Sequence, residues 1–221
     1  MSGDSAIARY TRGEEIANSL THACGIVLSI AGLAALIAAA TVRGGGVTEI
    51  ASCAIYGTTL IVLYTASTLY HSIPFAAPKR VLRTLDHLAI FLLIAGTYTP
   101  FVLIALRGAW GWTLFGIVWT LAVVGVAIEL SQMHRFRRLM IALYIGMGWV
   151  GLIAIKPLVA ALPSAGLWLL FGGGVSYTFG VIFYRWHSLR YHHALWHLFV
   201  LGGSVLQYFA VLHYVLPPAP S

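Results

Sequence analysis

Residues 191–197 read Tyr-His-His-Ala-Leu-Trp-His, and the chain then stays apolar to about Leu216. His193 and His197 are four residues apart, so on a helix they lie on one face, one above the other. His192 points about 100° away from that face, because a helix turns by that angle at each residue. The stretch therefore predicts a membrane-length helix that begins with two imidazoles placed to bind one metal ion.

The composition places the rest of the chain in a membrane as well. Of the 221 residues, 60% are hydrophobic and 9% are charged, and the mean hydropathy is +0.88. A soluble domain has about 25% charged residues and could not bury this much apolar surface. The apolar runs are continuous and have the length of membrane-spanning helices. We therefore expect an all-α integral membrane protein.

Short polar or Gly- and Pro-containing turns divide the chain into seven expected spans. These spans are about 16–41, 50–72, 85–106, 110–130, 139–162, 167–184 and 192–216. The connections are too short to fold separately, so residues 1–221 are expected to form one seven-helix membrane domain. Pro100 lies inside the third span and predicts a kink there.

The net charge of +7 comes from basic residues between the spans, not from a groove of alternating basic and aromatic residues, so nucleic acid is not an expected partner. Cytoplasmic loops are enriched in Lys and Arg. With the N-terminus inside, the inner segments hold Arg9, Arg12, Lys79, Arg80, Arg83, Arg135, Arg137, Arg138, Arg185 and Arg190. The outer segments hold only Arg43, Arg107 and Lys156. The bias predicts a multi-pass protein of the inner (plasma) membrane with a cytoplasmic N-terminus and an external C-terminus.

Polar residues from three spans are expected at one depth. His71 ends the second span, Asp86 opens the third and His197 opens the seventh, each on the order of 10 Å from the adjoining basic loop. Ionisable groups at such a depth are unfavourable unless they are paired or bind metal. Three neutral imidazoles with an open fourth position are an arrangement found in catalytic zinc sites. We expect His71, His193 and His197 to bind Zn²⁺, although three imidazoles also suit other divalent metals.

Asp86 and Ser67 are the catalytic candidates beside this metal. Asp86 can hold the zinc-bound water or take its proton. Ser67 lies one turn before His71 and can hydrogen-bond the water or a substrate carbonyl. Zinc lowers the pKa of a bound water to about 7, which makes hydroxide available at neutral pH.

Other polar residues have simpler interpretations. An isolated histidine at a span end, such as His87, is typical of the membrane interface, and Tyr10 and Tyr70 fit the aromatic belt there. Near the level of the histidines, a further polar cluster consists of Glu15, Asn18 and His22. This cluster is either a capping and packing cluster of the first helix or a group that supports catalysis, and the sequence leaves both interpretations open.

Three motifs resemble those of the hemolysin III family, the bacterial branch of the progestin and adipoQ receptor superfamily. They are residues 14–22 (EEIANSLTH), residues 67–71 (STLYH) continuing to residues 95–100 (AGTYTP), and residues 191–197 (YHHALWH). The resemblance covers nearly the whole chain. It implies a seven-helix fold with a cytoplasmic N-terminus. It also implies zinc held by His71, His193 and His197, with Asp86 and Ser67 near the bound water.

The superfamily is similar to alkaline ceramidases, which implies metal-dependent hydrolysis of a lipid amide. We therefore expect a zinc-dependent hydrolase of lipid amides or esters that acts in membrane-lipid homeostasis, with a membrane lipid as its partner. Two alternatives remain open: the family name implies a pore-forming hemolysin, and a non-enzymatic lipid sensor would use zinc as a structural ion. A pore needs polar groups along its whole length, whereas the polar layer expected here stops in the inner leaflet.

Overall fold

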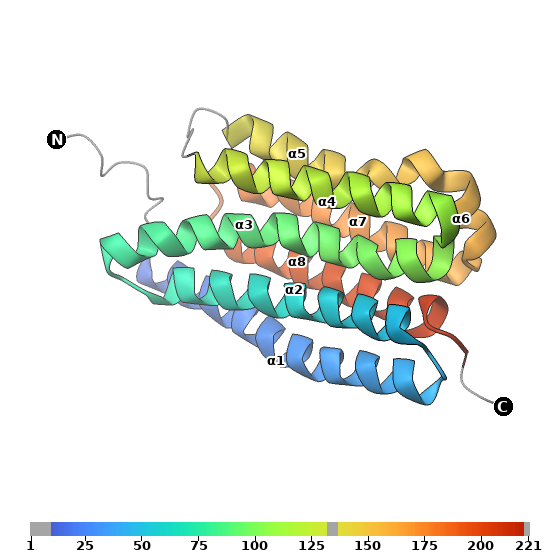
Figure 1. The fold of residues 1–221 in the computed structure, drawn as a ribbon. Helices are drawn as coiled ribbons and strands as arrows, with labels where there is room; N and C mark the ends of the chain where they lie inside the picture. The colour runs from blue at the N-terminus through green and yellow to red at the C-terminus, as the bar shows by residue number, and fades with distance from the viewer. Residues whose placement is uncertain (1–9, 132–136, 219–221) are drawn as a thin grey trace.

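The computed structural model describes residues 10–131 and 137–218, and this part of the chain contains helices and turns but no strand. Seven of its helical segments are long and apolar enough to cross a membrane. They lie side by side in one bundle, in which α1 begins and α8 ends at opposite ends (Figure 1). The expected all-α membrane fold is confirmed. The orientation of the bundle stays a prediction, and Arg9 and Arg135, which contribute to the charge bias, lie outside the described residues.

The elements follow one another with short connections. The first spans are α1 (Arg12–Val42), α2 (Val47–Ser72), α3 (Ala76–Pro100) with its π-helical continuation η1 (Phe101–Leu106), and α4 (Gly108–Leu130). The fifth span joins α5 (Arg137–Trp149), the 3₁₀ segment η3 (Val150–Ala154) and α6 (Ile155–Ala161). The last two are α7 (Ser164–Arg185) and α8 (His192–Ala210), which ends in the π-helical η4 (Val211–Val215).

Helix α8 lies between α7 and α2 in the view of Figure 1. It packs against α1 and α7. Helix α2 also reaches it, because Tyr64 Oη donates a hydrogen bond to Ser204 Oγ at 2.8 Å. The polar residues of α8, among them His193 and His197, therefore face protein rather than lipid.

The start of α1 is fixed by a capping box. Thr11 Oγ1 accepts from the backbone nitrogen of Glu14 at 3.3 Å, and Glu14 Oε2 accepts from the backbone nitrogen of Thr11 at 2.8 Å. The other oxygen of Glu14 accepts from the backbone nitrogen of Tyr191 at 3.1 Å. These bonds tie the beginning of α1 to the beginning of α8 and place both at the same end of the bundle.

Prolines change two spans from their expected form. The third helix begins at Ala76 instead of about residue 85, because Pro78 falls in the first turn, where a missing N–H is tolerated. Lys79 therefore lies in a helix, not in a loop. Pro100 cannot donate within the third span, and the helix continues past it in the wider π-helical form. In the fifth span, the ring of Pro157 would crowd the Ile153 carbonyl, and the chain there is 3₁₀-helical.

Candidate metal centre

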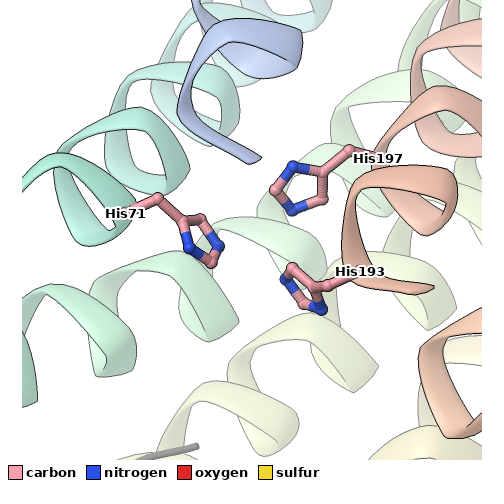
Figure 2. A group of neighbouring side chains, drawn as sticks. All are labelled: His71, His193 and His197. Atoms are coloured by element: carbon pink, nitrogen blue, oxygen red, sulfur yellow. The ribbon is translucent and has the colours of Figure 1, made fainter. Parts of the chain in front are cut away.

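Three buried histidines meet at the end of the bundle where α1 begins. His71 stands one residue before the end of α2, and His193 and His197 lie in the first turns of α8. One ring nitrogen from each lies within 4.8 Å of the other two. Figure 2 shows the three rings turned toward a shared space between α2 and α8. The structure thus brings together the residues that the sequence predicted as metal ligands.

Hydrogen bonds fix which nitrogen of His71 faces this space. His71 Nδ1 lies 2.6 Å from Glu15 Oε2 and 3.4 Å from Asn18 Nδ2. A carboxylate accepts and an amide nitrogen donates, so one ring nitrogen cannot satisfy both. The shorter, charge-assisted contact with Glu15 prevails and places the proton on Nδ1. The Nε2 atom then carries a lone pair, and it is buried without a hydrogen-bond partner among the described residues.

His197 is oriented in the same way by the backbone of α1. Its Nδ1 lies 3.0 Å from the carbonyl oxygen of Asn18, which can only accept, so Nδ1 carries the proton. Its Nε2 is left with a lone pair. His193 has no partner for either ring nitrogen within the described part of the chain. A histidine binds a metal through one ring nitrogen that carries a lone pair, while its other ring nitrogen is usually hydrogen-bonded. His71 and His197 have this arrangement.

Glu15 is held in place by a buried lysine. Lys79 Nζ donates to Glu15 Oε1 at 2.7 Å and to the Tyr70 carbonyl oxygen at 3.0 Å. Lys79 was expected in a basic loop, and this contact was not predicted, because α3 begins earlier than expected. Glu15 is therefore not part of the cap of α1, and it links Lys79 to His71.

Asp86 and Ser67 line the same cavity as His193 and His197. The cavity has a volume of about 380 Å³ and extends between α3, α5, α7 and α8. Ser67 is fully buried, and its side chain interacts with the Asp86 carboxylate. The Asp86 carboxylate interacts electrostatically with His71. Both catalytic candidates therefore lie beside the histidine cluster, while their chemical roles stay predictions.

Aromatic side chains cover the cluster. His22 stacks on His197 with 3.6 Å between ring centroids and an interplanar angle of 13°. The Tyr10 ring lies 5.1 Å from that of His193, and the Tyr70 ring lies 4.5 Å from that of His71. Tyr10 and Tyr70, which were expected only in the aromatic belt of the membrane interface, thus also enclose the site. His22 shares the cavity wall but forms no part of the three-histidine group.

His87 was expected to be an isolated interfacial residue, but it has a partner. Its Nδ1 lies 2.8 Å from Glu129 Oε1 of α4. Both residues line the cavity beyond Asp86. A polar pair therefore stands in the cavity wall on the side of α3 and α4.

The donor set suits a metal ion. Buried imidazoles with unpaired nitrogens are unfavourable in a low-dielectric interior unless something binds them. His71 Nε2 and both nitrogens of His193 are unpaired in this way among the described residues. His71, His193 and His197 are therefore the residues that would hold such an ion.

Sequence comparisons agree with this architecture. Residues 10–208 match the family described as Haemolysin-III related. The chain is 48% identical to Hemolysin-3 of Bacillus cereus over 206 residues, which cover 93% of this chain and 94% of that protein. It is 48% identical to the Hemolysin-3 homolog of Bacillus subtilis over 205 residues, covering 93% and 96%. It is 27% identical to human monocyte to macrophage differentiation factor over 210 residues, covering 91% and 84%. The chain is a multi-pass membrane protein that belongs to the haemolysin-III related family.

Proposed function

We propose that the protein is a zinc-dependent hydrolase of lipid amides or esters. The observation that carries this proposal is the convergence of three buried histidines, Asp86 and Ser67 at one end of a membrane-buried cavity. A zinc ion bound by the three histidines would supply a Lewis acid for a carbonyl group and for water. An open position beside three histidines is what distinguishes a catalytic zinc site from a structural one.

The surrounding residues have the chemistry that hydrolysis requires. Ser67, whose side chain interacts with Asp86, can donate its hydroxyl to the carbonyl oxygen of the scissile group, where negative charge develops. Asp86 can take a proton from the attacking water as the carbon–oxygen bond forms. It can then deliver that proton to the leaving nitrogen or oxygen as the scissile bond breaks. The products are a carboxylic acid and an amine or alcohol, so one water is consumed for each bond cleaved.

The cavity supplies a place for the acyl chain. Beyond Asp86, its walls are mostly apolar, with Leu63, Ile90, Leu93, Ile145 and Val200 among them. Burial of apolar chain surface contributes roughly 25 cal/mol per Å². A lipid substrate could therefore bind through its chain while its carbonyl group lies beside the histidines.

Metal content and turnover test this function together. Detergent-purified protein is analysed for bound metal and then incubated with long-chain lipid amides and esters. We expect about one zinc per chain in the wild type, loss of zinc and of turnover in His193→Ala, and retention of both in His192→Ala. His192 is the matched control, because its Nδ1 bonds to the Phe183 carbonyl outside the cluster. A metal-free wild type refutes the proposal, and zinc without turnover leaves a lipid sensor with a structural ion.

A second candidate comes from the names of the relatives. Two proteins that are 48% identical to this chain are called Hemolysin-3 and Hemolysin-3 homolog. A pore-forming activity would produce ion flux when purified protein is inserted into liposomes. If His193→Ala abolished turnover but left the flux unchanged, the two activities would be independent.

A further inference from the structure

A second, smaller cavity adjoins the first and shares part of its wall. The second cavity has a volume of about 60 Å³ and reaches Leu106 and Leu158, near the opposite end of the bundle. The two cavities share the lining residues Thr97, Tyr98, Gly148, Trp149, Gly174 and Gln207. A ligand chain that starts at the histidines would therefore pass Gln207 as it goes deeper.

Gln207 has an unused acceptor at this junction. Its Oε1 is buried and has no hydrogen-bond partner in the described part of the chain. Two of the neighbouring polar groups are satisfied by protein: Tyr98 Oη donates to the Gly148 carbonyl oxygen at 2.8 Å, and Trp149 Nε1 donates to Thr178 Oγ1 at 3.0 Å. A buried acceptor without a donor is unfavourable, more so where no water is at hand.

The position of the Gln207 amide is built into the packing of α7. Its Nε2 donates to the Leu170 carbonyl oxygen at 3.5 Å, and because a carbonyl cannot donate, the amide oxygen must point the other way. Gly173 leaves the space that the side chain crosses. A Cβ atom at Gly173 would lie 2.5 Å from Gln207 Cγ and 3.0 Å from Cδ. Helix α7 thus fixes the amide of a residue that lines both cavities, with its oxygen turned away from the Leu170 carbonyl oxygen.

The distance from the histidines sets where a ligand would meet this oxygen. Gln207 follows His197 by ten residues on α8, which corresponds to about 15 Å along the helix. An extended chain advances about 1.2 Å per bond, so this distance spans about 12 bonds. Gln207 is also on the same broad face of α8 as His193 and His197.

We propose that Gln207 Oε1 accepts a hydrogen bond from a hydroxyl group in the middle of the ligand's acyl chain, at about the twelfth carbon from the carbonyl group. The preferred ligands are then mid-chain hydroxylated acyl lipids. This inference rests on the proposed function, because the carbonyl group is taken to lie at the histidines. An acceptor selects a hydroxyl over a keto group, since a keto group has no proton to donate.

Direct binding tests the site without any need for turnover. Purified protein is titrated with octadecanoate, 12-hydroxyoctadecanoate and 12-oxooctadecanoate, in competition with a fluorescent fatty acid. We expect the wild type to bind the hydroxy acid about tenfold more tightly than the oxo acid. In Gln207→Leu, that preference should disappear, and the ratio of hydroxy-acid to octadecanoate affinity should fall by about tenfold.

Tyr98→Phe is the matched control. It removes a polar atom from the same part of the wall, but one whose hydrogen bonds go to protein, so the preference for the hydroxy acid should remain.

Equal wild-type affinities for the hydroxy and oxo acids overturn the inference, and so does failure of all three acids to bind. The wild-type comparison decides even if Gln207→Leu does not fold. Cleavage of lipid amides is measured on the same preparations. A preference for the hydroxy acid without cleavage refutes only the proposed hydrolase activity. Cleavage without that preference refutes only the hydroxyl-binding role of Gln207.

Discussion

Replacement of Glu15 by Gln would show whether the Lys79–Glu15–His71 connection prepares the metal site. Glu15 Oε2 accepts from His71 Nδ1 at 2.6 Å and keeps the lone pair on Nε2. A glutamine at this position has nearly the same shape, but its amide nitrogen can donate to Nδ1. The proton would then move to Nε2, the nitrogen that faces the other two histidines, and block its lone pair.

The size of the effect follows from the kind of contact that is lost. Removal of a residue that orients a metal-binding histidine typically weakens metal affinity by about 10- to 100-fold, or about 1.4–2.8 kcal/mol. A second effect falls on stability, because buried Lys79 loses its ion pair with a carboxylate and is left with neutral acceptors, such as the Tyr70 and Ile73 carbonyl oxygens and the new amide oxygen. The double variant Glu15→Gln/Lys79→Met removes the buried cation and should recover stability without recovering metal affinity.

The assay is a zinc competition titration against a chelator of known affinity, together with thermal unfolding in detergent. Glu14→Gln is the control, since Glu14 caps α1 and bonds to Tyr191 but does not contact His71. It should lower the unfolding temperature slightly and leave zinc affinity unchanged. Zinc affinity of Glu15→Gln within about twofold of the wild type, in folded protein, would refute the orienting role of Glu15.

Two further predictions concern the reaction and the packing. Asp86→Asn should lower turnover of a lipid substrate by about 10²- to 10⁴-fold, because Asp86 moves a proton. Its zinc content should stay near the wild-type value, because Asp86 is not one of the three ligands. Loss of zinc in this variant would contradict that assignment. Gly125→Ala should destabilise the bundle by about 1–3 kcal/mol in thermal unfolding, because its Cβ would overlap the Phe91 ring. Gly116→Ala, on the same helix with open space around it, should show no comparable loss.

The sequence predicted the histidine cluster because its geometry depends on only two regularities. A spacing of four residues places His193 and His197 on one helix face, and the alternation of span directions brings His71 to the same depth. Both hold for any bundle of antiparallel helices. Apolar run length alone was likewise enough to predict the seven spans.

Contacts between helices could not be predicted from one sequence. Lys79 reads as part of a basic loop, and its contact with Glu15 depends on the helix start at Ala76. Tyr10 reads as an interfacial residue, whereas its position over His193 depends on how α1 packs beside α8. The sequence did contain one signal for Gln207: it is a glutamine in an otherwise apolar span. Which way its amide points depends on the space at Gly173, which only the structure shows.

The two adjoining cavities differ in the polar groups of their walls for one physical reason. Charged side chains are tolerated in a membrane only where partners offset the loss of hydration, and Glu15, Lys79 and Asp86 all lie within a few turns of one end of the bundle. Deeper in, no described charged residue lines the smaller cavity, and Gln207 acts through a dipole instead of a charge. Selectivity at that depth must therefore come from neutral hydrogen bonds, each with a modest effect on affinity. Because a buried acceptor gains most when its donor arrives with the ligand, one amide can discriminate a hydroxylated chain from the same chain with a keto group.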